Sequence, residues 1–477
     1  MGGWASIYST TQAALANQTA QLAHLQEMAA SGLRVVRASD APTDASNILD
    51  LRSQSSSLQA YMQNIDSTSD DLQVATSAMQ SISTDLSRVR ELVTQASSGT
   101  YTAQDRLPIA GEINSLLEEI LSTANTDHLG QYVFAGDQPN NPAYVAQYKN
   151  GSITSVQYQG GTSDMPVPVA AGVEQSGVLV GTSVFANHSR GAPVFTGTTG
   201  AKGGTGTSTV EGDAWLAVTH TATTYAGASG IAAGSSSAGD DTVLGNGHTL
   251  TIDTVAKTLQ LDDAGSVSYE GDEGQTDFKV AGANGAAVYV NLTGLAAGFQ
   301  GTVGIQAAGT LSIDGGQSTV PIDFSDANTA VADSTTGKVL YVDSTGITQA
   351  GEEPVQNPGT YDLFGSLIAV RDAILNGDNL STADMQKRLS MAGSALQEAA
   401  GSVTQALTTS GARIQAMSSL KNNLTDFKTY ADQQSDSLSN ADIAQLSLEL
   451  ARYQTLYSMT LASSSKLLSL SLLDYMS

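Results

Sequence analysis

Apolar side chains recur at a seven-residue step in two long stretches, one toward each end of the chain. Over residues 48–97 every step falls on an apolar residue, and from Leu389 to Leu438 the step continues with Ser410 filling one position. A sustained heptad pattern is typical of long helices that pack along their length. We therefore predict two long helices that share a rod core, formed by Leu51, Leu58, Ile65, Leu72, Met79, Leu86, Val93, Leu389, Leu396, Val403, Met417, Leu424 and Leu438.

Signals for helix ends flank the first of these stretches. Pro42 suits an early helical position, Thr43 or Asp44 offers a capping oxygen, and Gly99 is a suitable stop. A second apolar face at helical spacing predicts another helix over residues 105–126. We expect these two helices to fold back on each other.

The two chain ends are apolar on one helical face and nearly uncharged. In residues 7–30 only His24 and Glu27 could carry charge, and in 443–473 the apolar set restarts out of step with the preceding heptads. We expect these segments to pair, and their remaining apolar surface to be buried by copies of the same protein in a head-to-tail ring or tube. The predicted assembly interface consists of Tyr8, Leu15, Leu22, Leu25, Ile443, Leu446, Leu450, Tyr453, Tyr457, Leu467, Leu470 and Tyr475.

The same periodicity also fits a simpler arrangement. In that alternative, the chain ends dock on the core of their own domain as part of a four-helix bundle. The hydrophobic pattern does not distinguish a bundle of one chain from a shared assembly, so both interpretations stay open at this point.

The middle of the chain has a different pattern, with short alternating runs bounded by Gly, Asn and Asp. These runs predict antiparallel strands and turns, whereas 196–212 is poor in apolar residues and predicts a loop or linker. The fold class expected is α+β, with a long α-helical coiled-coil bundle from both chain ends, a β-hairpin and an inserted, mostly antiparallel β domain. The expected strands lie in 131–136, 153–160, 249–263, 286–294, 309–314 and 338–346.

Composition narrows the function classes. The 477 residues include no cysteine, which excludes a disulfide scaffold and thiolate metal sites. The net charge is −26 and the isoelectric point about 4.2, which argues against nucleic-acid binding. No stretch has the long apolar run of a membrane helix. The first residues lack the basic patch and apolar stretch of a secretory signal, so we expect no cleaved signal peptide.

We find no pattern that predicts a catalytic, cofactor or metal site. Acidic turns at 262–266 and 270–277 lack the alternating ligand order of a calcium loop, and the glycine-rich 201–207 lacks the Lys-Ser/Thr of a phosphate loop. Tyr453 and Tyr457 are interpreted as packing residues. The histidines are scattered without metal-ligand spacing: His24, His128, His188, His220 and His248.

Both flanks resemble the flagellin superfamily and, within it, the flagellar hook-associated protein 3 family of hook–filament junction proteins. The N-terminal similarity lies in residues 25–53, which include Ser-Asp-Ala-Pro, in 86–106, and in 124–138 with its Tyr-Val-Phe-Ala-Gly. The C-terminal similarity lies in Gly-Ala-Arg of 410–417 and in Leu-Leu-Asp-Tyr of 468–476, an ending that flagellins generally lack. Asp-Ala-Pro stands where Asp-Asp-Pro is commoner, and the family says little about the long insert.

The resemblance implies a structural role in the bacterial flagellum, outside the cell, after unfolded export through the flagellar secretion apparatus. It implies partners of several kinds: copies of the same chain, adjacent hook-associated and flagellin subunits, and an export chaperone, without nucleic acid or membrane. It also implies three regions. These are paired terminal helices in the inner tube (1–42 and 439–477), a helical rod domain (43–187 and 355–438) with a β-hairpin at 131–185, and a variable solvent-facing β domain, with two subdomains as one option (188–354).

Two alternatives remain beside the junction role. The chain could be a filament flagellin, which would be abundant in flagella where a junction protein is scarce. Residues 190–350 could form an adhesive or glycan-binding module, although an acidic, glycine-rich spacer is the simpler interpretation.

Overall fold

The computed structural model forms two compact units and has the expected α+β fold. The first unit comprises Met1–Asp71, Pro166–Gly177 and Ala412–Ser477, and the second comprises Leu72–Met165 and Val178–Gly411. The structure describes residues 2–98, 101–177, 179–239, 241–377 and 379–476, without the side chains of 2–5, 7 and 467–476.

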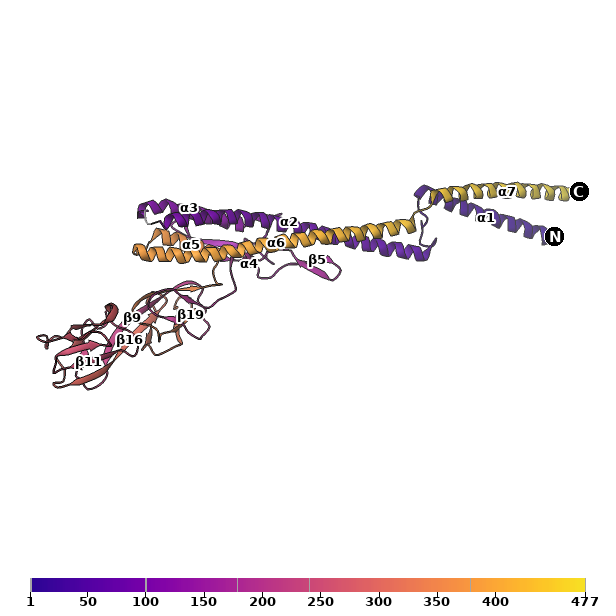
Figure 1. Cartoon of the computed structure of the whole chain (residues 1–477). Helices are drawn as coiled ribbons and strands as arrows, with labels where there is room; N and C mark the ends of the chain where they lie inside the picture. Colours follow the sequence, from indigo (N-terminus) through magenta and orange to yellow (C-terminus); the bar gives the residue numbers. More distant parts are fainter. Residues whose placement is uncertain (1, 99–100, 178, 240, 378, 477) are drawn as a thin grey trace. The chain divides into compact units, whose positions relative to one another are not determined.

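Five helices are present where the apolar periodicity predicts them: α1 (Gly2–Ser31), α2 (Pro42–Ala96), α3 (Ala103–Ala124), α6 (Thr382–Ser439) and α7 (Ile443–Met476). Two shorter helices, α4 (Gly181–Phe185) and α5 (Leu363–Leu375), are not among the predictions. The two longest, α2 and α6, are the two heptad stretches (Figure 1).

Short polar side chains define several helix starts. Thr102 and Asp105 form a reciprocal capping box at α3, and the Asp442 carboxylate accepts the first free N–H groups of α7. The predicted cap of α2 is wrong. Because α2 begins at Pro42, Thr43 and Asp44 lie inside its first turn.

Most of the predicted rod-core positions are buried. Leu51, Val93 and Leu438 are only partly buried. The polar residue in the heptads, Ser410, is fully buried, and its hydroxyl donates to the Ala406 carbonyl at 2.8 Å, which satisfies it within its own helix. The buried positions are Leu58, Ile65, Leu72, Met79, Leu86, Leu389, Leu396, Val403, Met417 and Leu424.

In the second unit, α3 and α5 pack against each other and against a β-hairpin. The buried Arg371 of α5 connects these elements, because its guanidinium donates to Asn114 Oδ1 at 2.9 Å and to the Ile153 carbonyl at 2.7 Å. A cluster of aromatic rings fills the adjoining core: Phe134, Tyr144, Tyr158, Phe185 and Phe364.

The single hairpin expected over 131–185 is three separate two-stranded ladders. They are β1 (Asp127–His128) with β2 (Gln131–Tyr132), β3 (Tyr144–Lys149) with β4 (Ser152–Tyr158), and β5 (Pro166–Ala170) with β6 (Val173–Ser176). The β5–β6 ladder belongs to the first unit, where Asn64 of α2 donates to the Pro168 carbonyl at 2.9 Å.

The inserted region is antiparallel β structure, as predicted. Its largest sheet has the strand order β13-β12-β11-β16-β9-β20-β7, with β17 paired to β16; smaller sheets are β10-β15-β14 and β18-β19-β8. Within the predicted loop 196–212 only the short β8 forms before β9 begins at Gly212. The strands are β7 (Val194–Phe195), β8 (Lys202–Gly203), β9 (Gly212–Tyr225), β10 (Ala232–Ala233), β11 (Thr249–Asp253), β12 (Thr258–Leu261), β13 (Val267–Ser268), β14 (Phe278–Ala281), β15 (Ala287–Asn291), β16 (Gln300–Ser312), β17 (Val320–Ile322), β18 (Thr329–Ala332), β19 (Val339–Asp343) and β20 (Gly351–Asn357).

The insert has two hydrophobic cores connected by its two longest strands. One core gathers around Phe324 and Leu340, and the other around Leu259 and Val288. Strands β9 and β16 pair along most of their length and contribute side chains to both cores. This ladder, whose register shifts once between Ala308 and Gly309, joins the two halves.

The chain enters and leaves the insert through two adjacent segments that α6 holds. Glu398 Oε1 accepts hydrogen bonds from Asn187 Nδ2 at 2.9 Å and from the Gly359 N–H at 2.6 Å. The Asn187 N–H donates in turn to the Tyr361 carbonyl at 3.0 Å. One carboxylate therefore fixes both connections.

A buried histidine predicts how the stability of the insert depends on pH. His220 is hydrogen-bonded to Thr242 and to the Ala222 carbonyl, and burial lowers its pKa by disfavouring the imidazolium. The unfolded chain, with a histidine pKa of about 6.5, binds the proton more readily. Neutral His220 therefore contributes to the stability of the insert above the pKa of the unfolded chain. This contribution is lost as the pH falls toward the lower pKa of His220 in the folded chain.

We expect the melting temperature of the insert to decrease when the pH is lowered from 7.5 to 5.5. This decrease should be smaller in His220→Gln. Calorimetry of the full chain at both pH values would measure it. The exposed His188 provides a control, since His188→Gln should keep the wild-type dependence. An unchanged slope in His220→Gln would contradict the assignment.

Candidate assembly surface

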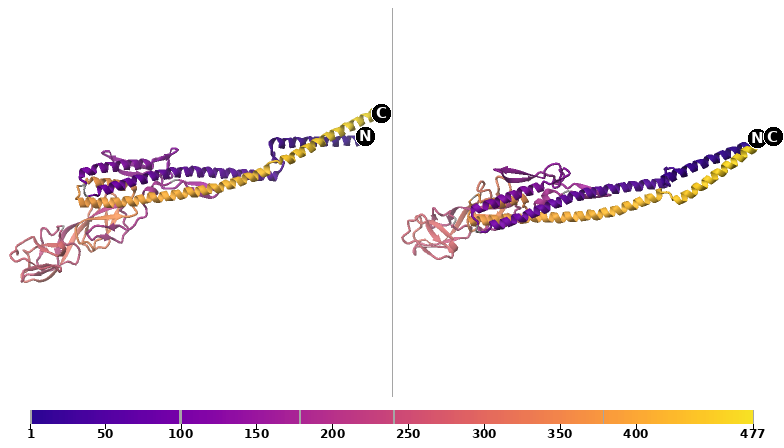
Figure 2. Two further views of the ribbon diagram at one scale, coloured as in Figure 1. Left: turned by 45° about the horizontal axis from the view of Figure 1, so that its top comes forward. Right: turned by 90° about the horizontal axis from the view of Figure 1, so that it is seen from above.

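The first and last helices pair with each other. Helices α1 and α7 lie side by side and antiparallel, with the start of α1 beside the end of α7 (Figures 1 and 2). Buried and partly buried side chains recur on each helix at steps of three and four residues, so each helix presents one face to the other. They include Thr11, Leu15, Gln18, Leu22 and Leu25 on α1, and Leu446, Leu450, Tyr453 and Tyr457 on α7.

A short backbone bridge sets where this pair begins. The Arg34 N–H donates to the Ser439 carbonyl at 2.7 Å, and the Ala441 N–H donates to the Gly32 carbonyl at 2.9 Å. Gly32 has a positive φ of 72°, which glycine adopts without steric cost as the chain leaves α1. The two segments that connect the terminal helices to α2 and α6 are thus bonded to each other.

The Arg34 side chain also contacts the elements on either side of this bridge. Its guanidinium donates to Asp44 at 2.6 Å and to the Leu438 carbonyl at 2.7 Å, which connects α2 and the end of α6. Both side chains of the ion pair are partly exposed, so the ion pair contributes little to stability. Its role is to orient the connecting segment.

The contact between α1 and α7 leaves a buried polar atom without a hydrogen-bond partner among the described residues. The Gln18 side-chain oxygen is buried and accepts no hydrogen bond from the residues that the structure describes. An unsatisfied buried polar atom costs about 1–3 kcal/mol. Two helices packed along one narrow face, with such a defect, gain little from pairing alone.

Much of the apolar surface of the pair faces outward. Tyr8 of α1 is 59% exposed, and Leu448 and Met459 of α7 are 71% and 62% exposed. Charge is sparse on this surface, because α1 carries only Glu27 apart from His24. Such a surface is poorly solvated, and burial against another protein would remove it from water.

The structure places the predicted interface residues in three groups. Leu25 and Leu446 are buried between the helices; Leu15, Leu22, Leu450, Tyr453 and Tyr457 are partly buried there; Tyr8 and Ile443 are exposed. Leu467, Leu470 and Tyr475 lie outside the side chains that the structure describes. The sequence reasoning missed Leu448, Leu456 and Met459, although their apolar character off the helical seam was a usable signal.

Among the residues that the structure describes, no three His, Asp or Glu side chains gather as metal ligands would. No helix in this part of the chain combines the length and the apolar character needed to span a bilayer.

Comparison with known proteins finds sequence similarity for the N-terminal part of the chain. Residues 5–138 match the bacterial flagellin N-terminal helical region. A flagellin of Listeria monocytogenes is 30% identical over 149 residues, which are 31% of this chain and 48% of that protein. Flagellar hook-associated protein 3 of Escherichia coli is 28% identical over 131 residues, which are 27% of this chain and 41% of that protein. The match therefore spans less than half the length of either relative.

Among solved structures, flagellar hook-associated protein-3 from Legionella pneumophila aligns over 82% of this chain and 98% of its own, at 17% identity and a TM-score of 0.44. The resemblance to the flagellin superfamily, including hook-associated protein 3, is confirmed over the N-terminal residues.

Proposed function

We propose, from the membership of residues 5–138 in the bacterial flagellin N-terminal helical family, that this protein is a structural subunit of the flagellar hook–filament junction. It works by packing and catalyses no reaction. Its terminal helices pair and join copies of the same chain in a ring, and adjacent hook-associated and flagellin subunits cover the remaining faces. The protein reaches this place outside the cell by export without a cleaved signal, escorted by a chaperone.

The outward apolar surface of α1 and α7 is the observation that carries the assembly role. Leu448 and Met459 are more than half exposed in the isolated chain, and the 34 residues of α7 carry only the charges of Glu449, Arg452, Lys466 and Asp474. A monomer that kept this surface in water would tend to associate nonspecifically. A regular assembly buries it in defined contacts, and a head-to-tail interface closes into a ring or continues as a tube.

The choice between junction and filament rests on weaker features. The matched relatives include both flagellins and hook-associated proteins 3, so the N-terminal helices do not discriminate. The Leu-Leu-Asp-Tyr ending at 472–475 favours the junction. A filament flagellin is the alternative, since flagellins share the helical flanks.

Location and abundance in isolated flagella test the proposal. We expect gold-labelled antibody against the β insert to mark only the point where hook meets filament, and the protein to be a trace component of sheared flagella. Labelling along the whole filament, with the protein as the dominant band, would identify a filament flagellin. Absence from flagella altogether would reject both roles.

A further inference from the structure

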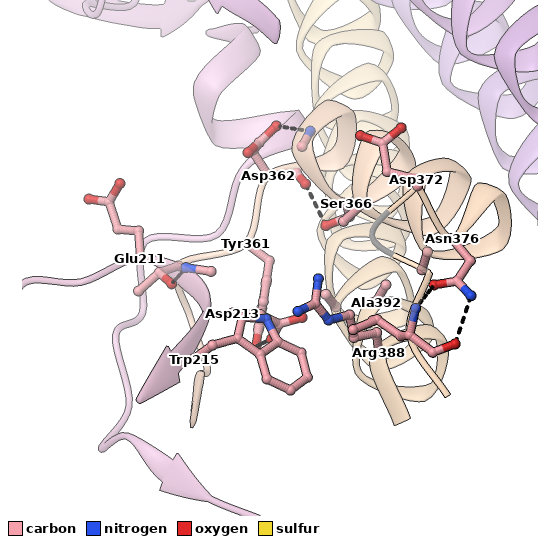
Figure 3. A pocket seen from close by; sticks show the side chains of 18 of the residues that line it. Glu211, Asp213, Trp215, Tyr361, Asp362, Ser366, Asp372, Asn376, Arg388 and Ala392 are labelled. Atoms are coloured by element: carbon pink, nitrogen blue, oxygen red, sulfur yellow. Dashed lines mark hydrogen bonds between the residues drawn. The ribbon is translucent and has the colours of Figure 1, made fainter. Parts of the chain in front are cut away.

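A pocket of about 530 Å³ opens where the β insert meets helices α5 and α6, all within the second unit. Trp215 and Asp213 line it from β9, Tyr361 from the segment before α5, Ala369 from α5, Asn376 from the end of α5 and Arg388 from α6 (Figure 3). Its volume lies in the range of small-ligand pockets, roughly 300–1,000 Å³.

Two contacts organise the aromatic wall. The Arg388 guanidinium lies over the Trp215 ring, 4.6 Å from the ring centroid. The Tyr361 hydroxyl donates to Asp213 Oδ1 at 2.7 Å. The indole and the carboxylate are thus held in place before any ligand enters, which lowers the cost of binding.

Asp213 is the polar group best placed to contact a ligand. Burial raises its pKa, and in the described part of the chain no cation lies within ion-pair distance of it. Burial and the Asp213 charge also raise the pKa of Tyr361, so the phenol stays a hydrogen-bond donor at neutral pH. Oδ2 accepts no hydrogen bond from the residues described, which leaves a partly desolvated acceptor on a residue that lines the pocket.

We propose that this pocket binds a neutral saccharide of one or two hexose units. Arg388 covers one face of the Trp215 indole, and the remaining apolar surface of this ring suits the C–H groups of a pyranose. Closely spaced acceptors and donors suit the hydroxyls of the sugar. Of the four carboxylates that line the pocket, Glu211 pairs with Lys338 and Asp372 with Arg371. Asp213 and Asp362 form no ion pair with the residues that the structure describes, so their charge disfavours acidic sugars, phosphates and nucleotides. The polar lining disfavours purely apolar ligands. This inference is independent of the flagellar role.

Intrinsic fluorescence gives a direct test, because the chain has only two tryptophans, Trp4 and Trp215. In the full chain carrying Trp4→Phe, Trp215 is the only indole. We expect a saturable change in its emission with glucose, galactose, N-acetylglucosamine or their β-linked disaccharides. Glucuronate should bind at least about tenfold more weakly than glucose, because its charge is repelled.

Two variants with matched controls locate the binding. Ala369 is exposed at the pocket wall, so Ala369→Phe should fill the pocket without disturbing the core and abolish the response. Ala416→Phe, at an exposed α6 position outside the pocket, should leave it unchanged. Asp213→Asn keeps the shape but removes the charged acceptor, and should weaken binding about tenfold. Asp326→Asn, an exposed carboxylate elsewhere in the insert, should not.

Three results would overturn the proposal. The first is no saturable response to any of these sugars up to about 100 mM, well above the millimolar constants of weak sites. The second is an equal response in wild type, Ala369→Phe and Asp213→Asn, which would place binding elsewhere. The third is a response only to a cationic probe such as agmatine, which would make the pocket a cation site.

Discussion

Deletion of residues 443–477 is expected to abolish incorporation into the flagellum while leaving the rest of the chain folded. The deletion removes α7, which provides half of the terminal pair and the exposed Leu448 and Met459. The cores of the second unit contain no residue of α7, so they should persist. The full chain should restore motility and filaments to a deletion strain, and the truncated chain should restore neither. Motility assays and electron microscopy would measure both.

Two controls separate assembly from folding and export. The truncated chain should appear in the culture medium in wild-type amounts, and the thermal transition of its second unit, followed by circular dichroism, should match that of the full chain. Filaments restored by the truncated protein would reject the assembly role of α7. Failure to leave the cell would instead assign α7 a role in export.

Replacement of Phe364 by alanine should destabilise the helical part of the second unit by about 3–5 kcal/mol, the range for deleting a buried phenylalanine ring. Phe364 is 2% exposed, and its ring lies 4.7 Å from that of Tyr144 and 6.0 Å from that of Phe185, measured between centroids. Its loss leaves a cavity that close-packed neighbours cannot fill. Denaturant unfolding followed at the helical circular-dichroism band would measure the loss.

An exposed phenylalanine gives the matched control. Phe427 of α6 is 61% exposed and lies in the first unit, so Phe427→Ala should change the transition of the second unit by less than about 0.5 kcal/mol. Equal effects of the two substitutions would mean that the aromatic cluster does not form the core described here.

The long helices could be predicted because their signal is local and redundant. In α2, the heptad positions from Leu58 to Leu86 are buried without exception, and each repeats the same information. Single polar interruptions do not break such a pattern. Ser410 is tolerated because its hydroxyl bonds to its own helix.

Features that depend on one contact between distant segments could not be predicted. The capping role given to Asp44 is wrong because α2 already begins at Pro42, and the Asp44 carboxylate pairs instead with Arg34, across a turn that no periodicity describes. Likewise, nothing in the apolar pattern indicates that Glu398 holds both connections of the insert, since its partners lie 211 and 39 residues away.

The candidate sites divide in the same way. The seam residues of α1 and α7, such as Leu25 and Leu446, follow from helical spacing at the chain ends. The saccharide pocket does not, because Trp215, Tyr361 and Arg388 come from a strand, a connecting segment and a helix that only the tertiary fold brings together. The family resemblance covers the flanks and is silent on this region.

The amino-acid sequence by itself determined the helices of both flanks, the β character of the insert and the apolar, sparsely charged chain ends. Each of these depends on a repeating local pattern that many residues share. The tertiary structure alone decided the bridge between Gly32 and Ala441, the attachment of the insert to α6 and the pocket beside Trp215. Those features depend on single side chains meeting across long stretches of chain, and local propensity carries no information about such meetings.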